Sequence, residues 1–229
     1  MAKTEHHIGI VLFDDFELLD VFGPVGLFSK LPEQYPISYV ARQSGRVRSS
    51  QGVEVIAETS FADASTPSIV LVPGGLGTRE LVNDRDFLST LSTWAAGARL
   101  VTSVCTGSAL LAAAGLLEGY RATSNKMAFH WATEHGRNVT WVAQARWVHD
   151  RDRWTSSGVA AGMDMTAALI SHLSGSEVAE TAARVLELEV HTDPGWDPFA
   201  TYYGLTEGMK RAPFDIASFQ ADGYSHEIT

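Results

Sequence analysis

Two hydrophobic patterns alternate along the chain. Short continuous runs of apolar and β-branched residues, typical of strands buried on both faces, occupy residues 8–13, 37–42, 68–73 and 99–104. Between and after these runs, apolar residues recur with helical spacing at residues 18–31, 84–98, 126–135, 163–173 and 177–191. Strands that alternate with helices in this way predict an α/β fold, with right-handed crossovers and a mostly parallel sheet covered by helices on both faces.

Three segments carry a more specific prediction. Residues 18–31 contain Gly23 and Pro24, and because proline fits best in the first turn of a helix, we expect the regular helix to begin near Pro24. Residues 46–60 alternate polar and apolar positions, which predicts a half-exposed hairpin. Residues 139–155 carry valine, tryptophan and threonine at strand-like spacing and predict further β-structure.

Composition narrows the class of protein. The chain has 229 residues, of which 45% are hydrophobic and 19% charged, and this fits one large globular domain. A formal net charge of −10 argues against nucleic acid or an anionic membrane as the main partner. No apolar stretch reaches the roughly 18 residues that a membrane span needs. Because the start lacks the apolar core of a signal peptide and one cysteine allows no internal disulfide, we expect a cytoplasmic protein.

The last part of the chain has a different character. Residues 193–229 are rich in proline, glycine, tyrosine and phenylalanine and show no clear period. We therefore expect an α/β domain at residues 1–192, followed by a C-terminal extension at residues 193–229 that packs on the domain or on a dimer interface.

Cys105, the single cysteine, stands where a strand turns into a helix. Residues 99–104 form the predicted strand, small residues follow at the turn, and an alanine- and leucine-rich helix runs to Gly115. A thiol at this turn lies near the first free N–H groups of the helix, whose partial positive charge favours the thiolate. The alternative is a cysteine that fills the core, since free cysteine is among the most buried residue types. The local sequence leaves both open.

A glycine-rich loop is expected close to this cysteine. In parallel α/β sheets, ligands bind at the carboxyl ends of the strands, so the loops after Phe13, Pro73 and Val104 should converge on one crevice. Without side chains at Gly74 and Gly75, a substrate can approach the backbone, and the N–H groups can point at a developing anion. A plain tight turn is the alternative for this loop.

Two carboxylates at the end of the first strand are candidates for proton transfer. Glu17 and Asp20 flank two leucines, and a carboxylate beside a reactive thiol can shuttle a proton if burial raises its pKa. Asp20 has an apolar setting in which an idle carboxylate would be costly. A solvated loop charge or a helix N-cap is the alternative for each.

Metal chemistry finds no support in the histidine pattern. His130 and His135 are five positions apart, whereas ligands on one helix face are three or four apart. The glycine-rich loop also lacks the spacing of a dinucleotide or phosphate site. We expect no metal and no cofactor, and a small molecule as the substrate.

Five short motifs, taken in order, resemble the ThiJ/PfpI superfamily, the cysteine-bearing relatives of class I glutamine amidotransferases. They are residues 9–13 (GIVLF), 19–24 (LDVFGP), 72–75 (VPGG), 104–108 (VCTGS) and 158–164 (GVAAGMD). The resemblance covers roughly residues 6–191. It implies a flavodoxin-like three-layer sandwich, a homodimer, and a cysteine on a strained nucleophile elbow.

Within the superfamily, the second and fourth motifs look most like isocyanide hydratases. That resemblance implies a lyase in which Cys105 attacks an isocyanide, forms a thioimidate and releases an N-substituted formamide. Asp20 would exchange the proton with the thiol, and the Thr106 hydroxyl would assist. Gly74, Gly75, Glu17 and Asn125 are the candidates for binding the substrate or an oxyanion.

Position 125 departs from many relatives, which carry a histidine twenty residues after the cysteine. Asn125 cannot take up a proton, so a cysteine–histidine dyad through this position is in doubt. The alternatives are a thiol amidase or peptidase, a glyoxalase-like enzyme, and a non-enzymatic redox or stress sensor. A fragment of an AraC-type regulator is disfavoured by the net charge and by the 38 residues after His191, too few for a paired helix-turn-helix module.

Overall fold

A computed structural model of the chain describes residues 5–206. The strands are β1 (Ile8–Val11), β2 (Ile37–Ala41), β3 (Gly45–Arg48), β4 (Glu54–Ala57), β5 (Thr59–Ser60), β6 (Ile69–Val72), β7 (Leu100–Ser103), β8 (Arg121–Ala122), β9 (Thr140–Trp141), β10 (Trp147–Asp150) and β11 (Arg153–Ser156). The helices are α1 (Leu18–Phe28), α2 (Thr78–Leu81), α3 (Arg85–Ala95), α4 (Gly107–Ala113), α5 (Phe129–Ala132), α6 (Ala161–Ser174), α7 (Ser176–Val185) and α8 (Pro198–Tyr202).

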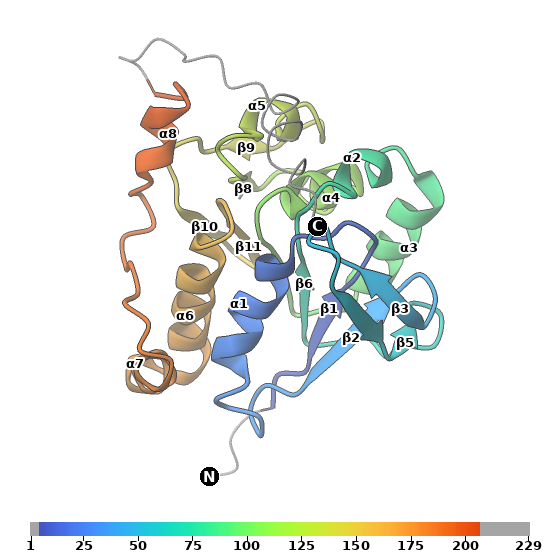
Figure 1. Ribbon diagram of the computed structural model, residues 1–229. Coiled ribbons are helices and arrows are strands. Elements are labelled where there is room, and N and C mark those ends of the chain that lie inside the picture. The colour runs from blue at the N-terminus through green and yellow to red at the C-terminus, as the bar shows by residue number, and fades with distance from the viewer. Residues whose placement is uncertain (1–4, 207–229) are drawn as a thin grey trace, which may run out of the picture.

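A seven-stranded sheet forms the centre of the molecule, in the order β10-β11-β7-β6-β1-β2-β5. All neighbours run parallel except β10, which pairs antiparallel with β11 at one edge. Helices α1, α6 and α7 pack together on one face, and α3 and α4 pack together on the other (Figure 1). The predicted flavodoxin-like three-layer α/β fold is confirmed.

The central strands are apolar because both of their faces are covered. Every residue of β1, β6 and β7 is buried, which explains the continuous apolar runs in the sequence. The register aligns Ile8 with Ile69, and Ile69 with Leu100. The three strands therefore end at one level, and the loops that follow them meet at one edge of the sheet, as predicted.

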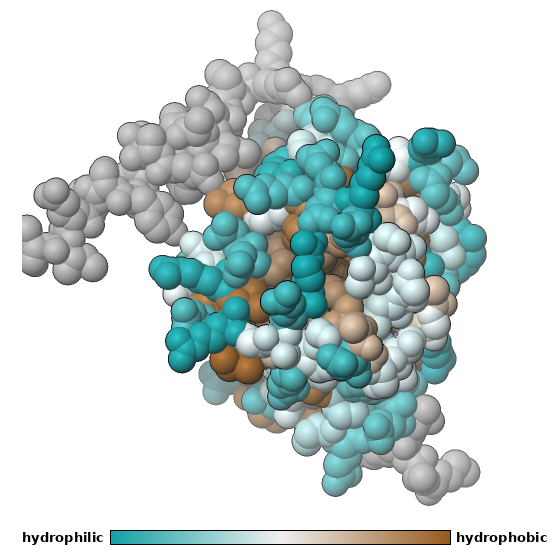
Figure 2. Space-filling view, turned by 90° about the vertical axis from the view of Figure 1, so that its right-hand side faces the viewer, coloured by the Kyte–Doolittle hydropathy of each residue, from teal (hydrophilic) through white to brown (hydrophobic). Residues whose placement is uncertain are grey.

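The predicted hairpin is present. Strands β3 and β4 pair antiparallel, with Gly45 opposite Ala57 and Arg48 opposite Glu54. The hairpin reaches the sheet edge where the loops meet, because Phe16 forms a parallel bridge with Ser49. Figure 2 shows the face of the molecule on this side, where polar side chains predominate and apolar ones appear in a hollow between them.

The start of the first helix differs from the prediction. Helix α1 begins at Leu18, and Pro24 lies inside it rather than in its first turn. Proline lacks the N–H that would donate to the carbonyl of Asp20, which weakens the helix at this point. Pro24 is buried together with Leu27 and Phe28, and this tertiary packing offsets the lost hydrogen bond.

Two other predicted elements are shorter or divided. The helix expected at residues 126–135 is limited to α5, and the helix expected at residues 177–191 ends at Val185. The β-structure expected at residues 139–155 is three strands. Strand β9 pairs with β8 in a separate small sheet, whereas β10 and β11 form a hairpin that turns at Arg151, which has a positive φ of 57°. Hydrophobic spacing does not show where such a run turns.

The described part of the C-terminal extension, residues 193–206, lies against the domain and ends in α8. The backbone N–H of Arg146 donates to the Pro194 carbonyl at 2.7 Å. Residues 207–229, for which the sequence predicts the same packing, lie outside the described residues. Among the described helices, none combines the length and apolar character required of a membrane-crossing segment.

Candidate active site

Cys105 occupies a sharp turn between β7 and α4. Its φ is 57°, a left-handed conformation that costs a non-glycine residue energy. The turn is held from several sides, because the Cys105 N–H donates to the Ser157 carbonyl at 2.9 Å, and its own carbonyl accepts from the hydroxyls of Ser108 and Ser124 at 3.1 Å each. The strained strand-to-helix elbow expected at Cys105 is therefore present.

Glycine at position 107 is a steric requirement of this elbow. A Cβ added there would lie 2.2 Å from the Val72 carbonyl oxygen and 2.7 Å from that of Pro73. The backbone of α4 can reach the neighbouring strand end only because Gly107 has no side chain. The small residues that the sequence places after Cys105 are thus needed for the turn itself.

Asp20 lies beside the thiol, in the first turn of α1 and fully buried. Its Oδ2 accepts a hydrogen bond from the Gly74 N–H at 2.8 Å. Its Oδ1 is buried and meets no N–H or O–H donor among the described residues. Burial raises the pKa of Asp20 to about 8, and the hydrogen bonds from Gly74 and Cys105 oppose the rise. At neutral pH this carboxyl is predominantly protonated.

The thiol itself is not activated in the way that the sequence predicts. Burial raises the pKa of Cys105 well above its usual range, and the negative charge of Asp20 raises it further. Hydrogen bonds from the Thr106 N–H and from Asn125 act in the opposite direction and are the weaker influence. The expectation of a thiolate favoured by the helix terminus is wrong for this resting state, because desolvation outweighs the N–H groups.

Asn125 contacts the thiol as a hydrogen-bond donor. Its Oδ1 accepts from the Ala128 N–H at 3.0 Å, which leaves the NH₂ group for Cys105. A donor at this point stabilises a negative sulfur, but it cannot remove a proton. Asn125 therefore binds charge at the site without acting as a base.

The glycine-rich loop positions other site residues. The N–H of Gly75 donates to the Thr106 hydroxyl at 3.1 Å, just as that of Gly74 donates to Asp20. A Cβ at Gly74 would lie 2.6 Å from the Thr106 nitrogen and 2.9 Å from Asp20 Oδ2. Both N–H groups already have protein acceptors, so the loop holds the carboxyl and the hydroxyl in place.

Glu17 lies at the rim of the site. Its backbone N–H donates to the Gly74 carbonyl at 2.8 Å, and its Oε2 accepts from Gln51 Nε2 at 2.8 Å. Its negative charge raises the pKa of Asp20 and of Cys105. The two predicted carboxylates thus lie at one site, with Asp20 as the inner one.

Three site residues have no signal in the sequence. Thr78 donates its hydroxyl to the Gly75 carbonyl at 2.7 Å and lies 3.1 Å from the Thr106 hydroxyl. Ser157 holds the Cys105 backbone. The Arg79 guanidinium is 3.5 Å from the ring centre of Trp131 and interacts electrostatically with Cys105. These contacts join segments that are far apart in the sequence, so no local motif predicts them.

The described residues contain no group of three or more histidine, cysteine, aspartate or glutamate side chains arranged to hold a metal ion. His135 packs its ring edge-on against Trp131, with ring centres 4.8 Å apart. Burial lowers the pKa of His135, so this imidazole is neutral at neutral pH. Its role in the structure is packing.

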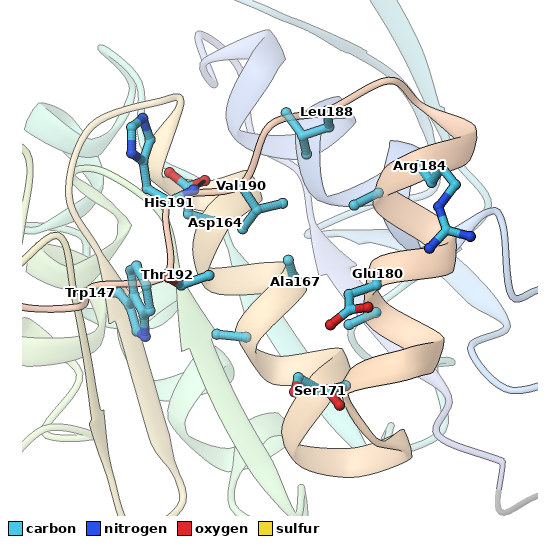
Figure 3. Close-up of a pocket in the computed structure, with 14 residues that line it drawn as sticks. Trp147, Asp164, Ala167, Ser171, Glu180, Arg184, Leu188, Val190, His191 and Thr192 are labelled. Atoms are coloured by element: carbon cyan, nitrogen blue, oxygen red, sulfur yellow. Dashed lines mark hydrogen bonds between the residues drawn. The ribbon is translucent and has the colours of Figure 1, made fainter.

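A cavity of about 640 Å³ lies away from the cysteine, between α6, α7 and the segment after α7 (Figure 3). Its lining includes Asp164 and Ala167 from α6 and Glu180 and Arg184 from α7, but not Cys105. A smaller cavity, of about 270 Å³, is lined by Asn125 and lies next to the elbow.

Comparisons with known proteins agree with this geometry. Residues 6–172 match the model of the DJ-1/PfpI family. The chain is 37% identical over 193 residues to an isonitrile hydratase of Pseudomonas putida, which covers 83% of this chain and 81% of the relative. It superposes on the crystal structure of a ThiJ/PfpI family protein from Pseudomonas syringae with a TM-score of 0.76 and 29% identity, covering 96% of this chain and 85% of that one.

A relative with a different role shares the same region. The HTH-type transcriptional regulator GbdR of Pseudomonas aeruginosa is 29% identical over 196 residues. The match covers 82% of this chain but 52% of the regulator. The chain thus spans about half the length of that relative.

Proposed function

The chain belongs to the DJ-1/PfpI family, and from this premise we propose that it is a cofactor-free isocyanide hydratase with Cys105 as nucleophile. The observation that carries the proposal is a buried thiol beside a buried carboxyl whose pKa is raised to about 8. Such a pair holds a transferable proton in a site shielded from water. The 37% identity to an isonitrile hydratase over most of both chains supports the choice of substrate.

The first step joins the sulfur to the terminal carbon of R–N≡C. The protonated Asp20 donates its proton to that carbon, the sulfur forms the C–S bond, and the thiol proton passes to the Asp20 carboxylate. The product is a thioimidate, R–N=CH–S–Cys105, and Asp20 is again neutral. The N–H of Thr106 and the amide of Asn125 stabilise the negative charge that develops on sulfur.

The second step adds water to the thioimidate carbon. The water oxygen bonds to carbon, and one water proton moves to the substrate nitrogen by way of Asp20. The C–S bond then breaks, the remaining hydroxyl proton passes to the sulfur, and R–NH–CHO leaves. The Thr106 hydroxyl, held by the Gly75 N–H, is the group we assign to orient this water.

The other thiol chemistries fit this site less well. An amidase or peptidase needs a base that activates the nucleophile, and Asn125 cannot act as one. A redox or stress sensor needs an accessible cysteine with a low pKa, whereas burial raises the pKa of Cys105. A glyoxalase-like enzyme is the second candidate, because it too combines a thiol with a proton carrier. The homodimer and the cytoplasmic location stay predictions.

The proposal predicts which two side chains are indispensable. Formation of the formamide from an aryl isocyanide can be followed by absorbance with purified protein. Cys105→Ala should abolish turnover, and Asp20→Asn should lower kcat by about 100-fold or more, since an asparagine cannot donate the proton. Because Asp20 must be protonated, wild-type activity should be full below pH 8 and fall as the pH rises through about 8.

A neighbouring carboxylate provides the matched control. Asp15 is exposed on the loop after β1, so Asp15→Asn makes the same chemical change outside the site and should retain full activity. Formamide production at the wild-type rate by Cys105→Ala or Asp20→Asn would refute the mechanism. Turnover of methylglyoxal but of no isocyanide would favour the glyoxalase-like alternative.

A further inference from the structure

The smaller cavity, beside the elbow, is walled by two parts of the chain that are far apart in sequence. One wall comes from Asn125, Met127 and residues 157–161, and the other from Phe199 and Tyr203 of the C-terminal extension. Its volume of about 270 Å³ lies just below the usual range of ligand pockets and suits a small hydrocarbon group. Its walls are predominantly apolar, so it favours an uncharged occupant.

The inner wall of this cavity contacts the nucleophile directly. Asn125 hydrogen-bonds the thiol, and the Ser157 carbonyl accepts the Cys105 N–H. Gly158 lies against the same amide, since a Cβ there would be 3.0 Å from Asn125 Nδ2. Cys105 is not itself part of the lining, so the link between the sulfur and the cavity runs through Asn125, which contacts both.

The C-terminal extension, which forms the outer wall, is held to the domain by a buried ion pair. Lys126 Nζ lies 3.7 Å from Asp197 Oδ2, and both side chains are 1% exposed. Asp197 also begins α8, because its Oδ1 accepts the Phe199 N–H at 3.0 Å. Buried ion pairs add little stability and are best attested as devices that fix one arrangement. Here the arrangement they fix is the position of Phe199 over the cavity.

We propose that this cavity receives the hydrocarbon substituent of the substrate and that Phe199 is a specificity-determining residue. The proposal rests on the isocyanide hydratase function proposed above. The lining contains two cationic residues, Lys126 and Arg146. Each already forms an ion pair, with Asp197 and Asp164 respectively, so the described lining has no free positive charge that would bind an anionic substituent. A ring the size of cyclohexyl or phenyl matches the volume.

The outer wall lies outside the residues that the family model matches. The family match ends at residue 172, whereas Phe199 and Tyr203 come later. The nucleophile, the carboxyl and the glycine-rich loop all fall within the match. We therefore assign the chemistry to the matched residues and the choice of substituent to the two walls of the cavity together.

Two variants with opposite effects on the cavity test this assignment. Phe199 is 54% exposed and Ala160 is exposed, so neither Phe199→Ala nor Ala160→Leu should disturb the core. The measurement is the ratio of kcat/KM for cyclohexyl isocyanide to that for methyl isocyanide. Phe199→Ala removes a wall and Ala160→Leu fills the space, and each should lower the ratio about tenfold while methyl isocyanide turnover is retained.

Tyr202→Ala is the matched control, because Tyr202 is an exposed aromatic residue of the same helix that does not line the cavity. It should leave the ratio unchanged. A ratio that stays at the wild-type value in both Phe199→Ala and Ala160→Leu would overturn the proposal.

A second readout separates the cavity from the hydratase activity. Alkylation of Cys105 by N-cyclohexyl iodoacetamide and by iodoacetamide, followed by intact mass, gives a ratio of rates that needs no isocyanide turnover. If the wild-type protein hydrates no isocyanide but this ratio falls in both variants, the cavity stands and the proposed function fails. If isocyanides are hydrated and neither ratio changes in either variant, the function stands and the cavity assignment fails.

Discussion

At the scale of single residues, the pair formed by Cys105 and Asp20 is governed by desolvation. Burial raises the pKa of both groups, so the resting site holds a neutral thiol and a predominantly neutral carboxyl at pH 7. A neutral acid is the form that can protonate an isocyanide carbon. Asp20 is a buried carboxyl whose Oδ1 has no hydrogen-bond partner among the described residues. Such a buried, unpaired polar atom lowers stability and is typical of functional sites.

The cost of burying Asp20 predicts a pH-dependent difference in stability. Its folded pKa of about 8 exceeds its ordinary value of 3.8, so between these pH values the folded state holds a proton that the unfolded state has lost. Stability should therefore fall as the pH rises through this window, by as much as about 1.4 kcal/mol per pH unit. Asp20→Asn removes this effect and should be more stable than the wild type at pH 7.

Urea unfolding of the wild type and Asp20→Asn at pH 4 and pH 7 measures this difference. The asparagine Oδ1 can still accept the Gly74 N–H, so the variant should fold normally. The advantage of Asp20→Asn should be large at pH 7 and nearly absent at pH 4. An equal difference at both pH values would show that the ionisation of Asp20 is not its cause.

At the scale of elements, the elbow depends on the close approach of α4 to the ends of β6 and β7. Gly107→Ala should destabilise the protein by about 2 kcal/mol or more, because the new methyl group would lie 2.2 Å from the Val72 carbonyl oxygen and the backbone must shift. The same shift moves Cys105, so turnover should fall as well. Thermal unfolding and the formamide assay measure the two effects.

Gly26→Ala is the control for this substitution. Gly26 is inside α1, and a Cβ there would make an ordinary contact of 3.8 Å with Leu186 Cδ1. An alanine in a helix interior is favoured over glycine by about 0.5–1 kcal/mol, so this variant should be at least as stable as the wild type. Equal losses in Gly107→Ala and Gly26→Ala would contradict the steric explanation.

The elements that could be predicted are those whose burial requires a recognisable pattern of residue types in the sequence. Strands buried on both faces require unbroken apolar runs, and the turn at Cys105 requires small residues. The start of α1 could not be predicted, because burial of Pro24 against the rest of the protein overrides its local preference. The contact of Ser157 with the elbow and the raised pKa of Cys105 depend on the assembled structure, and neighbouring residues in the sequence carry no sign of them.

At the scale of the whole molecule, the site combines segments from most of the chain's length. Asp20, Gly74, Cys105 and Asn125 come from four separate loops or helix starts, and the sheet register brings them to one edge. The extension is then fastened over this edge through Asp197. The position of the outer wall therefore depends on this ion pair as well as on the backbone hydrogen bond between Arg146 and Pro194.

Lys126→Met tests how much this fastening contributes. The variant leaves Asp197 buried without its cation, which should cost about 3–5 kcal/mol of the free energy of unfolding in urea. Lys126→Met combined with Asp197→Asn should recover part of the loss, because no unpaired charge remains at this point and the asparagine can still begin α8. The rest stays lost, because Lys126 Nζ also donates to Thr123, Ser124 and Ala145. Failure of the double variant to recover any stability would mean that the hydrogen bonds from Lys126 Nζ to Thr123, Ser124 and Ala145, and not the ion pair, account for the loss.

An exposed ion pair serves as the control. Arg42 and Asp84 form one at the surface, with side chains that are 54% and 32% exposed. Arg42→Met should change stability far less than Lys126→Met, since water replaces the lost partner. Comparable losses would show that burial of the Lys126 pair has no special effect.

The late position of Phe199 in the chain has a consequence for how the protein is made. Synthesis proceeds from the N-terminus, so the sheet, the elbow and Asp20 leave the ribosome before the residue that forms the outer wall of the cavity. A nascent chain can thus assemble its reactive pair while still unable to discriminate between substrates by size. Discrimination by size therefore begins only after α8, which Asp197 starts, has been synthesised and has packed against the domain.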